Sequence, residues 1–173
     1  MAKTNPKVIA SFQGKYRWLS NFYIEPDGSC VEREYQAAKA TNELDRDFIL
    51  HFYIYDKDGK VIGVRDTTPG ESKRRGQQIT CRPDWNNIDP RTGIEVKVGV
   101  MEDLVWRKFT ENPGLDDLLL ATNDAELIEG NNWKDRFWGV SNGEGRNELG
   151  KIIMRTRQKL RLNHNAKIVQ ATS

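Results

Sequence analysis

The chain has 173 residues, of which 37% are hydrophobic and 30% are charged, and its formal net charge is +2 at pH 7. This length fits one ordinary domain with room for a sizeable core, and the composition describes a soluble protein with a highly charged surface. A charge this close to balance argues against binding duplex DNA through many phosphates, and 2 cysteines are too few for a disulfide scaffold.

Targeting and metal-binding signals are weak. No apolar run approaches the roughly 20 residues that span a bilayer, and residues 1–6 lack the apolar core of a signal peptide, so we expect a cytoplasmic protein that does not enter membranes. Cys30 and Cys81 lie in no C-x-x-C pair and are expected to be reduced thiols. His51 and His164 have no partners at ligand spacing, so we expect no metal and no cofactor.

The predicted elements alternate between short strands and amphipathic helices. In chain order they are a strand over 8–12, an aromatic segment over 18–23, a turn at 26–28, a helix from about 31 to between 44 and 47, a hairpin of 48–55 and 61–64, a polar basic segment over 71–78, a loop around Trp85, a helix from 96 that Asn112 and Pro113 end, a short helix over 115–119, a strand over 125–129 and a last helix whose apolar stripe runs from 149 to 160. Residues 48–50 alternatively prolong the preceding helix. The pattern predicts an α+β, mainly α fold in a single domain over 1–173, with its core at about 8–161 and a flexible tail at 162–173.

The segment 31–39 carries the most informative spacing. A helix places positions i, i+3, i+4 and i+7 on one stripe, which here holds Glu32, Tyr35, Gln36 and Lys39. A carboxylate and an amine side by side in a partly buried site can perform acid/base and nucleophilic chemistry. The alternative is structural: Ser29 and Glu32 fit a capping box, and Lys39 would then be a solvated lysine.

The last helix offers the best candidate for a nucleic-acid-binding face. Its basic residues are Lys151, Arg155, Arg157, Lys159 and Arg161. We favour a solvated helix face over a phosphate-binding stripe, which would make binding fall steeply with salt.

Many short fragments along the chain match one family in order. They are Phe12-Gln-Gly14, Leu19-Ser-Asn-Phe22, Val31-Glu32 with Tyr35-Gln36 and Lys39, Ser72-Lys73 with Gly76, Arg82-Pro-Asp-Trp85, Met101 with Lys108-Phe109, Leu119-Leu-Ala-Thr122, Ile128-Glu129, Asp135 with Trp138-Gly139, and Gly145-Arg-Asn147-Glu-Leu-Gly150 with Met154 and Arg157. From about Phe12 to Leu160 the chain resembles the NADAR (YbiA-like) family, and this ordered set makes the resemblance specific.

The resemblance implies a compact, mostly helical domain that hydrolyses an N-glycosidic bond. Family members act on phosphorylated intermediates of riboflavin synthesis or remove ADP-ribose from guanine in nucleic acid. The expected partners are therefore a ribosyl phosphate or an ADP-ribose adduct, including ADP-ribosylated DNA or RNA. Two departures bear on substrate choice: Arg33 stands where the family usually has His, and residues 51–66 look like an extra hairpin.

With the resemblance, Glu32 and Lys39 become the predicted catalytic pair, with the carboxylate stabilising charge at C1 of the ribose and the amine forming a Schiff base with it. Lys73 is the alternative nucleophile, although a lysine in a basic run more often contacts phosphate. The predicted substrate-binding residues are Asn21, Tyr35, Lys73, Trp85, Asp135, Trp138, Gly139 and Asn147.

Several of these residues also have ordinary structural readings. Trp85 and Trp138 lie beside polar turn residues, where an exposed indole stacks on a base, but either could equally pack in the core. Asp135 fits a turn, and Asn147 fits the cap of the last helix, with neighbouring amides holding phosphate. A non-catalytic ADP-ribose or nucleotide sensor would keep the binding pocket and lose turnover, and borohydride would then trap no adduct on the lysine.

Overall fold

The computed structural model describes the backbone of residues 6–171 and the side chains of residues 6–166. By the clustering of its contacts the chain forms two compact units, one made of residues up to Glu25 and from Val105 onward, the other of Pro26–Leu104. The expectation of a single domain stays a prediction, while the helix-rich composition with short strands confirms the α+β, mainly α class.

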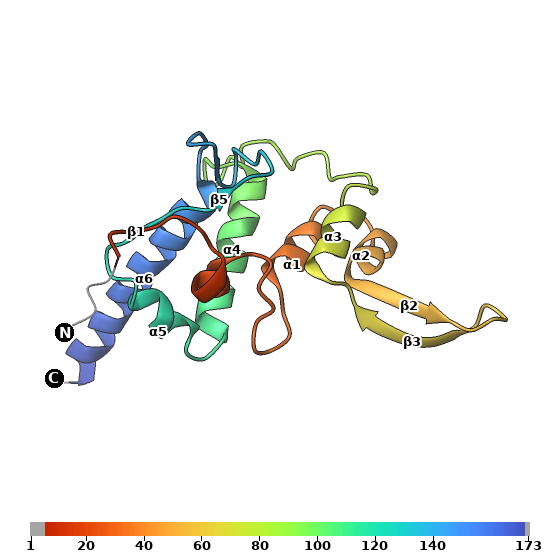
Figure 1. Cartoon of the computed structure of the whole chain (residues 1–173), viewed down its shortest axis with the longest axis horizontal. Helices are drawn as coiled ribbons and strands as arrows, with labels where there is room; N and C mark the ends of the chain where they lie inside the picture. The colour runs from red at the N-terminus through yellow and green to blue at the C-terminus, as the bar shows by residue number, and fades with distance from the viewer. Residues whose placement is uncertain (1–5, 172–173) are drawn as a thin grey trace. The chain divides into compact units, whose positions relative to one another are not determined.

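The unit of Pro26–Leu104 is built from short helices and a hairpin (Figure 1). Its elements are α1 Val31–Ala37, α2 Glu43–Leu50, β2 His51–Tyr55, β3 Val61–Asp66, α3 Pro69–Arg75 and the beginning of α4 Val96–Glu111. Helix α1 packs against both α2 and α3. The core of the unit contains Cys30, Val31, Tyr35, Ala37, Ile49, Trp85, Val98 and Met101.

The predicted hairpin is confirmed over residues 51–55 and 61–64. Strands β2 and β3 pair antiparallel from His51 opposite Asp66 to Tyr55 opposite Val61, with an irregularity near the tip. The turn uses Gly59 at φ 80°, a conformation that favours glycine. Residues 48–50 are helical, as the alternative interpretation held, but they belong to a separate helix, α2, and not to the helix that begins at Val31. In Figure 1 the two strands extend away from α2 and α3. Most of the large apolar side chains of these strands are exposed.

The predicted end of the first helix is wrong, because α1 ends at Ala37 instead of continuing to residues 44–47. After Ala37 the chain tightens into i→i+3 hydrogen bonds, from Lys39 N to Gln36 O at 3.2 Å and from Ala40 N to Ala37 O at 3.1 Å. Asn42 then caps the next helix by accepting a hydrogen bond from Asp45 N. Asn42 is therefore a sequence signal for the start of a second helix, which the prediction of one continuous helix from its periodicity missed.

Helix α3 was not foreseen in the basic segment that follows Pro69. Thr68 and Glu71 form a complete capping box, with Thr68 accepting from the Glu71 amide and Glu71 accepting from the Thr68 amide, and Pro69 occupies the first turn. Thr67, which is 1% exposed, donates to the Ile49 carbonyl at 2.7 Å and lies 2.8 Å from Ser72 Oγ. These bonds tie the start of α3 to the end of α2.

The other unit holds the long C-terminal helix. Its elements are β1 Val8–Ile9, the 3-10 helix η1 Gly14–Leu19, the end of α4, α5 Leu115–Leu120, β4 Glu126–Leu127, β5 Gly130–Asn131, β6 Val140–Ser141 and α6 Glu148–Ala171. Strand β1 pairs parallel with β4, and β5 pairs parallel with β6. The expected strands at 8–12 and 125–129 are thus present but shorter.

The apolar stripe of the last helix is confirmed. Leu149, Ile152, Ile153, Thr156 and Leu160 are all buried, at 9% exposure or less, and α6 contacts both β4 and α5. The helix continues to Ala171, so residues 162–171 of the expected tail have a helical backbone, whereas 172 and 173 lie outside the described residues. Within residues 6–171, no helix combines the length and apolar character that crossing a membrane requires.

Candidate active site

Helix α1 gathers the four side chains of the predicted stripe. Glu32 lies in its first turn, Tyr35 and Gln36 follow at helical spacing, and Lys39 lies just beyond its last residue. Because the chain keeps turning through i→i+3 bonds after Ala37, Lys39 returns to the same face although it is outside the helix. The predicted clustering is therefore confirmed, even though the predicted helix length is wrong.

The capping-box alternative for Glu32 is wrong. The N-cap residue of α1 is Cys30, whose side chain makes no capping hydrogen bond, so Glu32 is not at the third helical position that a capping box needs. Ser29 instead bonds Asp27, with its amide and its hydroxyl both donating to Asp27 Oδ1 at 2.8 and 2.6 Å. Glu32 is 6% exposed, and burying a carboxylate requires a reason other than capping.

A hydrogen-bonded row connects the acid to the amine. Gln36 Nε2 donates to Glu32 Oε1 at 2.8 Å, and Lys39 Nζ donates to Gln36 Oε1 at 2.6 Å. Lys39 Nζ also lies 5.5 Å from the centre of the Tyr35 ring, within the range of a cation–π contact. The sequence placed Gln36 on this face but gave it no role, and the structure shows that it bridges the two predicted catalytic groups.

The surroundings of Lys39 favour its neutral form. Burial lowers the pKa of the Lys39 ammonium from the ordinary value of 10.5, the charges of Glu32 and Cys81 act in the opposite direction, and the charge of Lys73 lowers the pKa further. A partly buried amine with a lowered pKa is the kind of group that serves as a nucleophile near neutral pH. Lys73, the alternative nucleophile, is thereby placed as an electrostatic neighbour of Lys39.

Tyr35 is backed by Trp85. The two rings have their centres 5.0 Å apart at an interplanar angle of 51°, and Trp85 is only 6% exposed. Of the two interpretations left open for Trp85, packing in the core is confirmed and the exposed indole is wrong, because the loop that carries it folds inward onto Tyr35. Its predicted contact with substrate stays a prediction, and what the structure shows is a packing partner beneath the ring that faces Lys39.

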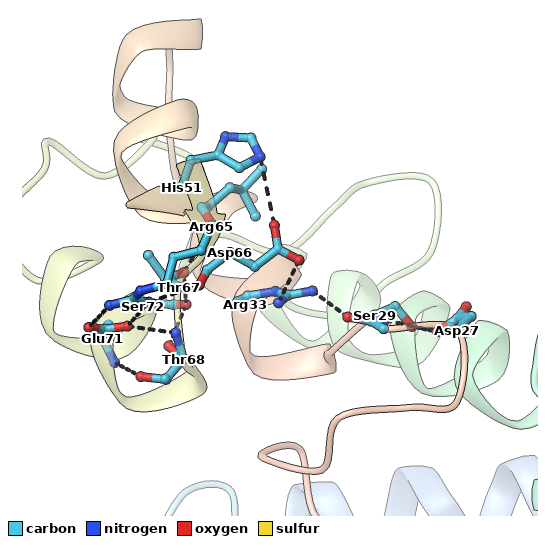
Figure 2. Close-up of polar contacts among 12 residues, drawn as sticks. Asp27, Ser29, Arg33, His51, Arg65, Asp66, Thr67, Thr68, Glu71 and Ser72 are labelled. Carbon is cyan, nitrogen blue, oxygen red and sulfur yellow. Dashed lines mark hydrogen bonds and ion pairs between the residues drawn. The ribbon is translucent and has the colours of Figure 1, made fainter. Parts of the chain in front are cut away.

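Arg33, the departure from the family pattern, links α1 to the base of the hairpin. Its guanidinium donates to the Gly28 carbonyl at 2.6 Å and pairs with Asp66 Oδ2 at 3.1 Å. Figure 2 shows Arg33 between the segment before α1 and Asp66 at the end of β3. The two departures are thus physically coupled, since the residue next to Glu32 anchors the extra hairpin.

In the other unit, Asp135 acts as a turn residue. Its Oδ1 accepts from the amides of Phe137 and Trp138 at 3.1 and 2.9 Å, and its own amide donates to Asn131 Oδ1 at 3.0 Å. Trp138 is half-buried and packs edge-on against Phe137 with ring centres 4.9 Å apart. The turn reading of Asp135 is confirmed, and the substrate contacts predicted for Asp135 and Trp138 stay predictions.

Gly139 and Asn147 secure close backbone approaches. A Cβ on Gly139 would lie 2.1 Å from the Glu129 carbonyl oxygen, so only glycine fits there. Asn147 accepts from the Glu129 amide at 3.0 Å and donates to the Leu127 carbonyl at 2.9 Å. Asn147 directly precedes α6, but its side chain ties the helix start to the β4–β5 segment, a role that neither the capping nor the phosphate interpretation contained.

The sequence analysis did not predict a second buried pair of an acid and an amine, Glu25 and Lys108. Lys108 Nζ donates to the Ser20 carbonyl at 2.8 Å, lies 4.0 Å from Glu25 Oε1 and 5.3 Å from the centre of the Tyr23 ring. The side chains of Lys108 and Glu25 are each 2% exposed. The available signal was the position of Lys108 on the apolar face of α4, since a cation there must find partners. Asn21, from the same segment as Ser20, is 8% exposed, and its substrate contact stays a prediction.

The basic face of α6 is interrupted at its centre. Arg157 is 6% exposed and turns inward, donating to Thr122 Oγ1 at 2.7 Å and to the Ala125 carbonyl at 2.9 Å. Arg161 pairs with Asp124 at 2.7 Å and Lys151 with Glu148 at 3.3 Å. Arg157 therefore belongs neither to the favoured solvated face nor to a phosphate-binding stripe, so both interpretations are wrong for this residue. Among the side chains that the structure describes, no three His, Cys, Asp or Glu residues cluster closely enough to hold a metal ion.

Comparison with known proteins agrees with this description. The chain is 40% identical over 154 residues to N-glycosidase YbiA of Shigella flexneri, covering 84% of this chain and 82% of that protein. It is 30% identical to N-glycosidase Npun_R5314 of Nostoc punctiforme, covering 84% and 86%. Riboflavin biosynthesis protein VVA0006 of Vibrio vulnificus is 34% identical over 88% of this chain, which spans only 38% of the length of that relative.

A solved structure shares the fold. The NMR structure of the E. coli protein YbiA superposes with a TM-score of 0.66 at 28% identity, covering 90% of this chain and 84% of that one. The NADAR domain family model matches residues 10–161, nearly the whole range over which the ordered fragments were found. On this match and on the identity to the YbiA proteins, the chain belongs to the NADAR family.

Proposed function

We propose that this protein is a hydrolase of N-glycosyl bonds that removes the base from a ribosylated substrate. The observation that carries the proposal is the row Glu32–Gln36–Lys39, in which a half-buried amine of lowered pKa is held close to a buried carboxylate. The names of the YbiA and Npun_R5314 relatives, which match most of this chain, support the same reaction class.

The chemistry assigned to the row is covalent. The neutral Lys39 amine attacks C1 of the ribose while the C1–N bond to the base breaks, and the electron pair of that bond leaves with the base. The proton that Nζ gives up passes to Glu32 and then to the departing nitrogen. The remaining N–H proton moves to the ring oxygen as the C1–O bond opens, which leaves an imine between C1 and Nζ.

Water completes the reaction. It adds to C1, and its two hydrogens restore the Lys39 amine as the sugar is released. The balance is one glycoside and one water giving one free base and one free sugar, with no other reactant. Glu32 serves as the proton carrier and stabilises positive charge at C1, which is the role of a carboxylate in glycoside hydrolysis.

The substrate class is a ribosylated base that carries phosphate. The two candidates are a phosphoribosylated intermediate of riboflavin synthesis, in line with the name of the VVA0006 relative, and ADP-ribose attached to guanine in nucleic acid. Lys73 lies near enough to Lys39 to influence its pKa, and we assign Lys73 to a phosphate of the substrate.

Release of free base tests the proposal. Purified protein is incubated with an ADP-ribosylated guanine oligonucleotide and, separately, with a pyrimidine ribosyl phosphate, and the base is measured by mass spectrometry. We expect turnover of one substrate, loss of activity by a factor of about 10²–10⁴ in Glu32→Gln, and no detectable turnover in Lys39→Met. Lys60→Met, on the exposed hairpin turn, is the matched lysine control.

Two results would contradict the proposal. Failure to release base from either substrate would favour a binding domain that lacks turnover. Full activity in both Glu32→Gln and Lys39→Met would remove these residues from the chemistry, whatever the substrate.

A further inference from the structure

The orientation of the Gln36 carboxamide is fixed by what its neighbours can accept or donate. Glu32 as a carboxylate only accepts, so the amide nitrogen must face it, and Lys39 as an ammonium only donates, so the amide oxygen must face it. The observed contacts, 2.8 Å from Nε2 to Glu32 and 2.6 Å from Oε1 to Lys39, have this arrangement. The reverse orientation would oppose like groups at both ends.

Gly76, at the end of α3, leaves room for this carboxamide. Its backbone is ordinary for a helix end, with φ −63° and ψ −13°, so conformation does not require glycine there. Space does, because a Cβ on Gly76 would lie 2.2 Å from Gln36 Oε1 and 3.1 Å from Gln36 Cβ. Gln36 is itself 5% exposed, and helices α1 and α3 pack together, so the carboxamide is enclosed where it meets Gly76.

We propose that Gln36, held in place by Gly76, is the positioning residue of the active site, which keeps the Lys39 amine and the Glu32 carboxylate at opposite ends of one hydrogen-bonded row. This inference rests on the proposed function. It adds an uncharged spacer to the acid and the amine and assigns a role to a glycine on a different helix.

The spacer matters because both end groups must be deprotonated, the acid as a charged carboxylate and the amine as a neutral base. In direct contact a carboxylate and an ammonium stabilise each other's charged forms, which keeps the amine protonated and unreactive. The carboxamide gives Lys39 a neutral acceptor and gives Glu32 a neutral donor. Burial then lowers the pKa of Lys39 with less opposition from the Glu32 carboxylate. The other groups whose charges act on this amine are Cys81, which raises its pKa, and Lys73, which lowers it.

The test uses two substitutions that disturb the spacer and one control. Gly76→Ala keeps the identity of all three row residues but places a methyl group 2.2 Å from the Gln36 amide oxygen, so this flexible end of the side chain has to move away. Gln36→Glu places a carboxylate beside Lys39. Gly70→Ala, in the first turn of the same helix, is the control, because its Cβ would approach nothing closer than Arg74 Nη1 at 3.7 Å.

Two readouts separate positioning from simple damage. For Gly76→Ala we expect kcat to fall about tenfold to hundredfold with KM close to that of the wild type, whereas Gly70→Ala keeps the wild-type values. Lys39 is also labelled with acetic anhydride over a pH series, and the labelled peptide is quantified by mass spectrometry. The pH of half-maximal labelling should be higher in both Gln36→Glu and Gly76→Ala than in the wild type.

The outcomes remain distinct if the proposed function fails. Should the wild type release no base from either substrate, the reaction is wrong, and the labelling alone decides the inference: a shift to higher pH in both variants supports it. Wild-type labelling in Gln36→Glu and Gly76→Ala would overturn it. With an active wild type, an unchanged kcat in Gly76→Ala would also overturn it.

Discussion

The neighbours of Lys39 should move its titration in opposite directions. Burial is the largest influence and lowers the pKa of this amine, Glu32 and Cys81 raise it, and Lys73 lowers it. Glu32→Gln removes the neighbouring negative charge, so the amine should lose its proton at lower pH than in the wild type. Lys73→Met removes a like charge, so the amine should hold its proton to higher pH.

The consequence for reactivity follows from the neutral fraction. At pH 7.5 an amine with the ordinary pKa of 10.5 is neutral in about one molecule in a thousand, and each unit by which the pKa falls increases that fraction about tenfold. The rate of any step that uses the neutral amine should therefore rise about tenfold per pH unit below the pKa and level off above it.

Competitive labelling of the Lys39 amine measures this without requiring turnover. Wild type, Glu32→Gln and Lys73→Met are labelled over a pH series, and the Lys39 peptide is quantified against a peptide that contains an exposed lysine such as Lys60. The pH of half-maximal labelling should fall in Glu32→Gln and rise in Lys73→Met. Shifts in the same direction, or a wild-type midpoint at that of the exposed lysine, would refute the electrostatic reasoning.

Three further predictions concern stability. Arg157→Ala removes two buried hydrogen bonds from a charged donor, so it should lower the free energy of unfolding by about 3 kcal/mol or more and Tm by roughly 6–12 °C. The control Lys159→Ala, on the exposed side of the same helix, should change the free energy of unfolding by about 0.5 kcal/mol or less. Equal Tm values in the two variants would contradict the inward orientation of Arg157. Gly150→Ala places a Cβ 2.2 Å from the Leu127 carbonyl oxygen and should cost about 1–3 kcal/mol by urea unfolding, and an unchanged midpoint would show that this approach is looser than described. Hydrogen bonds from Arg65 and from the Thr68 amide hold the pKa of Glu71 well below its usual range. The stability that these bonds give is therefore present above the ordinary carboxyl pKa and is lost on acidification. Between about pH 6 and pH 3, Glu71→Gln should lose less of its free energy of unfolding than the wild type does, and equal losses in the two proteins would contradict this role of Glu71.

Periodicity predicted the parts of this protein that depend on local spacing. The stripe of α6 is buried as expected, because an apolar face at 3.6-residue spacing must find a partner. The face that holds Glu32 and Lys39 was found for the same reason. The prediction that these residues share a face is correct although the predicted end of the helix is wrong, because the i→i+3 turns after Ala37 advance the chain by nearly the same angle per residue as an α-helix does.

Contacts between distant segments were beyond the reach of that reasoning. The bridge from Gln36 to Lys39 is local, but the reason it is enclosed is Gly76, which lies on another helix. Lys108 meets Ser20 and Glu25 only after the chain has folded. The sequence left both core packing and an exposed ring open for Trp85 for a related reason, since polar neighbours in a turn do not reveal whether the loop folds outward or back onto Tyr35.

The covalent bond that we propose between Lys39 and the sugar can be trapped directly. Wild-type protein is mixed with whichever ribosylated substrate it cleaves, sodium borohydride is added during turnover, and the modified peptide is identified by mass spectrometry. We expect a reduced ribosyl adduct on Lys39 in the wild type and no adduct in Lys39→Met. An adduct on Lys73 instead, or turnover without any adduct on Lys39, would contradict it.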